Sequence, residues 1–207
     1  MLISVLFIVL LVAGILYSII LHEIAHGYIA SKLGDDTAKV MGRLSLNPLA
    51  HIDPFGTVLL PLSLFLLGLP VFGWAKPVPV NPNKMEKPNE DFFIVSLAGP
   101  ITNFIIALIL GLTIRFLPIP EFVIGFLATI VQINLVLMIF NLIPIPPLDG
   151  SKVLGLFLPE ETFLFLQQFG IYILIFLLLF SSTFPFIQFI INRTVNFFFN
   201  LITGQNI

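Results

Sequence analysis

The first 21 residues, from Met1 to Leu21, contain no charged side chain. About 20 apolar residues in helical conformation are enough to cross the hydrocarbon core of a bilayer. The whole chain is 58% hydrophobic and only 10% charged, with a mean hydropathy of +1.10, whereas a soluble domain averages about 25% charged residues. The composition therefore predicts a polytopic protein embedded in a lipid bilayer.

The positions of the apolar runs predict an all-α fold of about five to six membrane helices. The runs cover residues 2–31, 92–117, 121–143, 162–181 and 186–202. The first run has no basic start and no small-residue cleavage site after it, so we expect a retained helix rather than a signal peptide. The run 55–70 is shorter and interrupted by Pro61, Gly68 and Pro70. We expect it to be a re-entrant segment that makes no net crossing.

Two segments resemble strands more than helices. Residues 39–47 alternate apolar and polar side chains, and residues 71–80 are rich in Val and Pro and contain the single tryptophan, Trp74. Such patterns are typical of edge strands. Because unpaired strands cannot face lipid, the sequence predicts a small membrane-associated β-hairpin or sheet.

The charged and sulfur-containing residues exclude some functions. A net charge of −2, with no Lys/Arg-rich segment, argues against a nucleic-acid partner. The absence of cysteine excludes disulfides and thiolate metal sites. Any metal must therefore be held by nitrogen and oxygen ligands.

The sequence "HEIAH", residues 22–26, fits the H-E-x-x-H pattern. On a helix, His22 and His26 lie on one face, where both imidazoles can reach one ion. Glu23 lies beside that face and can accept a proton from a metal-bound water. Zinc suits such ligands, so we predict one Zn²⁺ per chain. The alternatives at this point are a polar patch packed between helices, a haem site or a transport site.

The third metal ligand predicted from the sequence is Asp149, in "NLIPIPPLDG". The prolines before it break the helix, and Gly150 frees the backbone after it. A carboxylate at the end of an interrupted membrane helix is well placed to bind metal. The alternative is an aspartate in an interfacial turn.

Sharing one ion constrains the topology. His22 and His26 lie towards the end of one predicted helix, and Asp149 follows the end of another, so both ends must be on the same side of the membrane. Seven of the nine basic residues would then share that side, which predicts a cytoplasmic location for it. These are Lys32, Lys39, Arg43, Lys76, Lys84, Lys87 and Lys152.

Several motifs together resemble the site-2 protease family of zinc intramembrane metalloproteases, in its compact bacterial form without a PDZ-like or nucleotide-sensing domain. They are "LHEIAHGYIA", "GRLSLNPLAHIDPFGT", "GWAKPVPVNP", "SLAGPITNF" and "NLIPIPPLDGSKVL", between residues 21 and 154. The resemblance implies that His22, His26 and Asp149 bind zinc and that Glu23 is the catalytic base. It also implies that Asn103 assists substrate binding or transition-state stabilisation. The residues themselves leave open a helix-packing hydrogen bond for Asn103.

The resulting prediction is a single integral-membrane protease domain over residues 1–207, with a catalytic core of about 1–155 and a C-terminal helical pair of about 160–203. We expect it to cleave transmembrane segments of membrane-bound proteins, in a bacterial inner membrane, with its active site towards the cytoplasm. The competing hypotheses are a non-proteolytic zinc-binding scaffold or chaperone and a metal transporter.

Three other residues receive structural interpretations. We expect His51 to stabilise a turn with Asp53 rather than to bind metal or substrate. Asn141 is expected to support the proline-rich helix break. Trp74 is interpreted as an interfacial anchor rather than a stacking surface for substrate.

Overall fold

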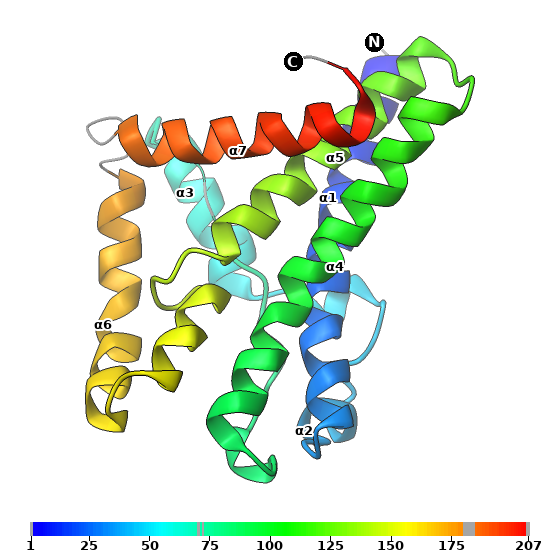
Figure 1. The fold of residues 1–207 in the computed structure, drawn as a ribbon. Coiled ribbons are helices and arrows are strands. Elements are labelled where there is room, and N and C mark those ends of the chain that lie inside the picture. Colours follow the sequence, from blue (N-terminus) through cyan, green and yellow to red (C-terminus); the bar gives the residue numbers. More distant parts are fainter. Residues whose placement is uncertain (1, 70, 72, 180–184, 206–207) are drawn as a thin grey trace.

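The computed structural model describes residues 2–69, 71, 73–179 and 185–205, and every regular element in these ranges is a helix (Figure 1). The α-helices are α1 (Leu2–Lys32), α2 (Thr37–Val40), α3 (Leu60–Leu66), α4 (Pro88–Phe116), α5 (Glu121–Asn141), α6 (Glu160–Leu179) and α7 (Pro185–Thr203). The short 3₁₀ or π segments are η1 (Pro48–His51), η2 (Pro54–Leu59), η3 (Pro82–Lys84) and η4 (Asp149–Leu156).

Four of these helices are long and apolar enough to cross a membrane: α1, α4, α5 and α6. The all-α, integral membrane character predicted from the sequence is therefore confirmed. The predicted number of five to six membrane helices is too high for the described residues.

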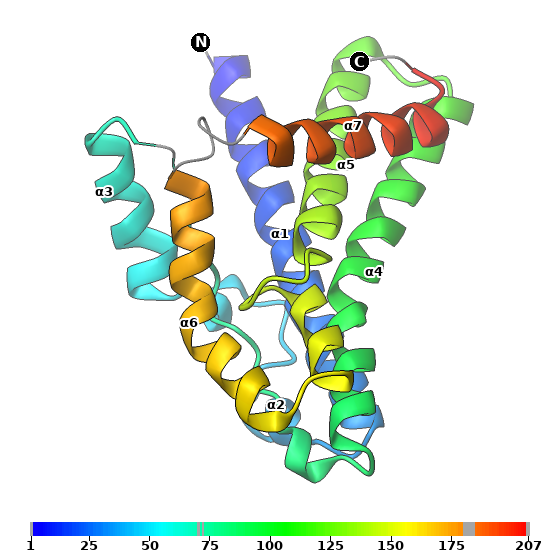
Figure 2. The ribbon, with the colours of Figure 1, turned by 60° about the vertical axis from the view of Figure 1, so that its left-hand side comes forward.

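The difference from the predicted number lies in α7. Polar side chains recur along this helix, at Asn192, Arg193, Asn196 and Asn200. It runs crosswise over one side of α4 and α5 instead of parallel to them (Figures 1 and 2). Its other side buries Val195, Phe199 and Ile202 in the main apolar core. A helix with both a polar stripe and an apolar face is suited to packing its apolar face on other helices while its polar stripe faces away from them.

The helices α1, α4 and α5 pack against one another and position the rest of the molecule. Side chains of α4 and α5, including Ala107, Val131 and Leu135, are fully buried. Small residues bring the helices close together, since a Cβ at Gly14 of α1 would press on Ile130 of α5. The lower halves of α1 and α4 run beside each other and end near α2 (Figure 2).

The predicted β-hairpin is wrong for the described residues. Thr37–Val40 forms a helix, and the rest of 39–47 and the described part of 71–80 are irregular or extended without strand pairing. Pro77 and Pro79 lack the N–H groups that a ladder requires. The neighbouring backbone groups bond instead to side chains from elsewhere in the chain.

The interrupted run 55–70 forms one short apolar helical segment, Pro54–Leu66. The Asp53 carboxylate caps its start by accepting hydrogen bonds from the backbone N–H groups of Phe55 (3.0 Å) and Gly56 (2.7 Å). The segment is shorter than the roughly 20 residues that a full crossing needs. Its re-entrant placement stays a prediction.

Candidate metal centre

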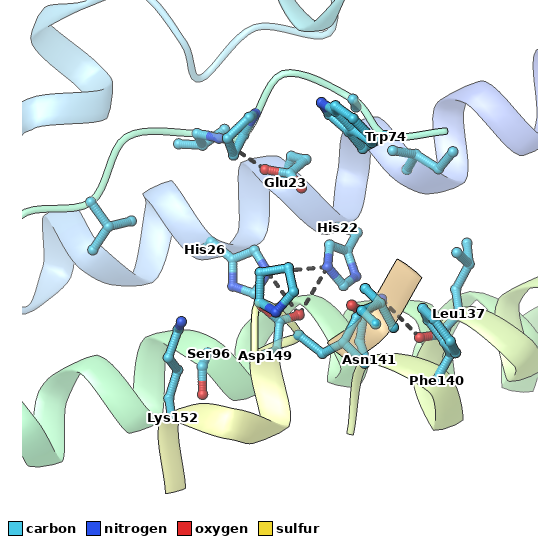
Figure 3. Close-up of a pocket in the computed structure, with 18 of the residues that line it drawn as sticks. His22, Glu23, His26, Trp74, Ser96, Leu137, Phe140, Asn141, Asp149 and Lys152 are labelled. Atoms are coloured by element: carbon cyan, nitrogen blue, oxygen red, sulfur yellow. Dashed lines mark hydrogen bonds and ion pairs between the residues drawn. The ribbon is translucent and has the colours of Figure 1, made fainter. Parts of the chain in front are cut away.

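Three side chains from two distant parts of the sequence meet at the middle of the molecule. The Nε2 atoms of His22 and His26 lie 3.1 Å apart, and Oδ2 of Asp149 lies 3.1 Å and 3.3 Å from them. Figure 3 shows both imidazoles turned from α1 towards Asp149. These are the three residues predicted as metal ligands from the sequence, and the structure brings them together as a group that could bind a metal ion.

The backbone around Asp149 explains how a residue so far along the chain reaches α1. α5 ends at Asn141, and prolines at 144, 146 and 147 prevent the helix from continuing. The chain then folds back on the end of α5. A Cβ at Gly150 would lie only 2.9 Å from the Ile143 carbonyl oxygen and closer still to Leu142. Glycine therefore permits the close approach that brings the carboxylate of Asp149 to the histidines.

Hydrogen bonds to the other ring nitrogens orient both imidazoles. Nδ1 of His22 lies 2.5 Å from Oδ1 of Asn103, and Nδ1 of His26 lies 2.8 Å from the carbonyl oxygen of Val95. Since both partners are acceptors, each Nδ1 carries the proton and each Nε2 has a free lone pair. This is the arrangement that metal-binding histidines use.

The support behind His22 continues through the helix core. Asn103 Nδ2 donates to Oδ1 of Asn134 (2.9 Å), and Asn134 Nδ2 donates to Ser18 Oγ (2.9 Å). All four side chains are buried, and both asparagines are 0% exposed. The chain of bonds links α1, α4 and α5, so the orientation of His22 depends on the packing of all three helices.

The donor set fits a metal ion. With both Nδ1 atoms protonated, two nitrogen lone pairs and a carboxylate oxygen converge without a proton between them, and Oδ2 of Asp149 is a buried atom without a hydrogen-bond donor. The three atoms repel one another electrostatically, and a cation bound among them relieves that repulsion. Ligand atoms of a tetrahedral zinc site are about 3.3 Å apart, close to the observed 3.1–3.3 Å. Gly99 of α4 leaves room, since a Cβ there would lie 2.6 Å from His22 Nε2.

The charge state of Asp149 also suits a ligand. Its burial raises the pKa of the carboxyl group, but with both imidazoles protonated, as they can be before a metal binds, the hydrogen bonds and positive charge of His22 and His26 outweigh that effect and hold the pKa at about 2. A cation that displaces those protons therefore meets a carboxylate that is already ionised.

Glu23 leaves α1 in a different direction from the two histidines, towards the extended segment that carries Trp74 (Figure 3). Its Oε2 accepts a hydrogen bond from the backbone N–H of Val78 (2.9 Å). Glu23 is not part of the three-residue metal group. It lines the same cavity as the histidines, as a general base beside a metal must.

That cavity has a volume of about 680 Å³ and is mainly apolar. Its walls come from α1, the segment 73–80, the start of α4, the end of α5, the Asp149 turn and α6. One charged residue in the wall, Lys152, was considered in the sequence only as a basic residue. It follows Asp149 by three positions in the 3₁₀ segment η4, where such residues share a face.

Lys152 is held on the cavity wall by two neighbours. Its Nζ donates to Oε1 of Gln167 (3.0 Å) and lies 5.3 Å from the ring centre of Phe92. Burial lowers the pKa of Lys152, while the charge of Asp149 acts in the opposite direction. It is the residue of the cavity that sequence reasoning missed, and its i, i+3 spacing from Asp149 was the available signal.

The remaining predicted residues have clear positions. Asn103 is buried behind His22 and both ends of its amide are already bonded, so its role in binding substrate stays a prediction. His51 lies outside the metal group, and its Nε2 bonds to the Ser45 carbonyl (2.8 Å) rather than to Asp53. Asn141 donates to the Leu137 carbonyl (3.0 Å) within its own helix. Trp74 lines the cavity.

Comparison with known proteins agrees with this geometry. The sequence matches Peptidase family M50 over residues 10–120 and 119–181, most of the chain. The chain belongs to peptidase family M50. This confirms the resemblance to site-2 proteases found in the sequence motifs. No solved structure matches the chain.

Three relatives illustrate the relationship. "Putative zinc metalloprotease YwhC" of Bacillus subtilis (strain 168) is 44% identical over 154 residues, covering 70% of this chain and 67% of that protein. "Putative zinc metalloprotease Rip2" of Mycolicibacterium smegmatis is 35% identical, with 74% and 59% covered. "Zinc metalloprotease MJ0392" of Methanocaldococcus jannaschii is 31% identical, with 76% and 35% covered. This chain therefore spans about three fifths of Rip2 and about a third of MJ0392.

Proposed function

We propose that this M50 protein is a zinc-dependent intramembrane endopeptidase that cleaves transmembrane segments of membrane-bound proteins. The observation that carries the proposal is the convergence of His22, His26 and Asp149 beside Glu23 in one cavity between apolar helices. Scaffolds and chaperones have no need of a base beside the ligand group, so this arrangement favours catalysis.

The residues divide into two roles. His22, His26 and Asp149 would hold the zinc ion, and bound zinc acidifies water and polarises a carbonyl group. Glu23 accepts the proton of the attacking water and then donates it to the leaving nitrogen of the peptide. Asn103 keeps His22 in the orientation and tautomer that binding requires.

The cavity fits an unwound peptide better than an intact helix. A volume of about 680 Å³ accommodates several side chains, whereas a helix is about 10–12 Å across with its side chains. The substrate is therefore a transmembrane segment that opens locally, exposing a carbonyl to the site. We place the site towards the cytoplasm of a bacterial membrane, because the end of α1, α2 and the start of α4 lie at one end of the molecule (Figure 1), and Lys32, Lys39, Lys84 and Lys87 lie in or next to these elements.

The experiment compares new protein termini in membranes of cells that express the wild type or Glu23→Gln. The variant keeps the three metal ligands and loses the base. We expect termini within transmembrane segments only in the wild type, with one zinc per chain in both purified proteins. Identical termini in both samples, in the presence of a membrane protein that a relative cleaves, would favour the zinc-binding scaffold instead.

A further inference from the structure

One peptide group beside the active-site candidate is hydrogen-bonded at both of its ends. The Val78 N–H donates to Glu23 Oε2 (2.9 Å), and the Pro77 carbonyl oxygen accepts from Nη2 of Arg43 (3.2 Å). These two atoms belong to the same Pro77–Val78 peptide unit. The Arg43 guanidinium and the Glu23 carboxylate are therefore connected through a single rigid plane.

The local sequence makes Val78 a unique donor. In "KPVPV", residues 76–80, prolines precede and follow Val78, so it is the one residue of 77–79 with a backbone N–H. Val78 is only 7% exposed, so little of this residue meets bulk solvent. An ionised carboxylate that accepts a buried N–H gains a strong bond, typically about 1.5–3 kcal/mol.

Hydrogen bonds also fix the residues before Val78, from Trp74 to Lys76. Arg43 Nη2 also donates to the Lys76 carbonyl (2.8 Å), and the Lys76 N–H donates to the His51 carbonyl (2.9 Å). Trp74 N–H donates to the Gly56 carbonyl (3.1 Å). The extended segment is thus held by residues between positions 43 and 56. These bonds fix the position of Val78 relative to Glu23.

Arg43 is unusual because it is a buried cation without a carboxylate partner. It is 8% exposed, and among the described residues no acid lies within ion-pair distance of it. A buried charge is costly unless it is compensated. The carbonyl dipoles of Lys76 and Pro77 compensate the charge of Arg43. The Pro77 carbonyl belongs to the same peptide group as the Val78 N–H, so its bond to Arg43 also polarises the N–H that donates to Glu23.

We propose that Arg43 is a positioning residue for Glu23, acting through the Pro77–Val78 peptide. The guanidinium orients this peptide, and its N–H anchors one carboxylate oxygen, which leaves the other oxygen facing the cavity as the proton acceptor. The catalytic consequence rests on the proposed peptidase function, but the contact itself does not.

The first test is spectroscopic and independent of activity. The infrared difference between the wild type and Glu23→Gln isolates the carboxylate band of Glu23 in the purified full-length protein. We expect Arg43→Lys and Val78→Pro each to shift this band, because the anchoring bond is weakened or removed. Arg115→Lys is the matched control, since Arg115 also donates to a carbonyl, that of Leu201 (2.8 Å), far from the site. An unmoved band in both site variants overturns the proposal.

The second test is kinetic. We expect Arg43→Lys to lower kcat by about 10- to 100-fold with unchanged KM, because a misplaced base costs rate rather than affinity. The Arg115→Lys control should keep the wild-type kcat. In a Glu23→Asp background the shorter carboxylate no longer reaches Val78, so adding Arg43→Lys should cost less than about 2-fold.

The results separate this inference from the proposed function. An equal loss of kcat in the wild-type and Glu23→Asp backgrounds, or loss of bound zinc in Arg43→Lys, means that Arg43 is purely structural. A band that shifts in Arg43→Lys and Val78→Pro, together with a wild type that cleaves no membrane protein, supports the positioning and rejects the peptidase. A wild type that cleaves with no effect of Arg43→Lys on rate or band rejects the positioning alone.

Discussion

The two sides of the metal centre are held by different kinds of structure. The side with the three candidate ligands lies among α1, α4 and α5, and buried side chains such as Asn103 and Asn134 orient it. The side that carries Glu23 faces an irregular segment, and backbone groups of 76–78 orient it. Adjacent positions on one helix, His22 and Glu23, therefore depend on separate networks.

This difference implies that metal affinity and catalytic rate can be changed independently. A substitution in the helical network should disturb the ligands and lower zinc affinity. A substitution in the segment should leave zinc bound and disturb the base. The predictions below test that separation, starting with the largest effect.

Asp149→Ala should abolish stoichiometric zinc binding. The variant loses the one anionic ligand of the group, and it leaves His22 and His26 with no charge to offset the metal. Metal content of the purified protein measures the effect, and peptidase activity should be lost with it. The exposed acid Asp36 provides the control, because Asp36→Ala should retain one zinc per chain. Full zinc content in Asp149→Ala would remove this residue from the site.

Asn134→Ala should weaken zinc binding by about 10- to 100-fold, as loss of outer-shell partners typically does. Asn134 touches no ligand directly, but its loss leaves the Asn103 amide free to turn away from His22. Competition with a zinc chelator measures the affinity. Thr129→Ala on the same helix is the control, because the Thr129 hydroxyl donates to the Gly125 carbonyl of its own helix, outside the Asn103–Asn134–Ser18 chain of bonds. Equal affinities in the two variants would show that the network does not support the ligands.

Asp35→Asn should have the smallest effect, a loss of unfolding free energy from the region where Asp35 joins Thr37 to Asn81. Asp35 is 0% exposed and accepts bonds from the N–H groups of Asn81 (2.6 Å) and Thr37 (3.0 Å), as well as from the Thr37 hydroxyl. Its burial raises the pKa of the carboxyl, but these bonds and the charge of Lys84 outweigh it, so the pKa is below its ordinary 3.8. We expect the variant to lose about 2 kcal/mol of unfolding free energy at pH 7.

The pH dependence follows from the direction of that shift. A lowered pKa means that the stabilisation by Asp35 is complete above about pH 3.8 and disappears as the pH falls through the folded-state pKa. The difference between wild type and Asp35→Asn should therefore shrink only in acid. Equilibrium unfolding in detergent micelles at several pH values measures it, with Asp36→Asn as the exposed neighbour for comparison. A difference that is constant down to pH 2 would contradict the assignment.

Local patterns predicted the parts of the molecule that depend on nearby residues. The i, i+4 spacing of His22 and His26 placed both on one helix face, and the prolines before Asp149 correctly ended α5. The predicted strands failed because proline-rich segments lack the donors for a ladder, and their backbone groups found side-chain partners instead. Residues 186–202 are not among the four helices long and apolar enough to cross a membrane in the described part of the chain, because an apolar run with a polar stripe can also form a helix that packs crosswise on other helices.

The sequence by itself predicted the four apolar helices α1, α4, α5 and α6 and the three candidate metal ligands of this M50 protein, since hydrophobic length and residue spacing are local properties. Only the tertiary structure decided which groups hold them. Asn134 and Ser18 are 116 residues apart and become partners only when α5 packs against α1. Arg43 reaches Glu23 only through a peptide 34 residues further along the chain. Hydrogen bonds between distant segments depend on how the helices and loops pack, and no pattern within a single segment records that.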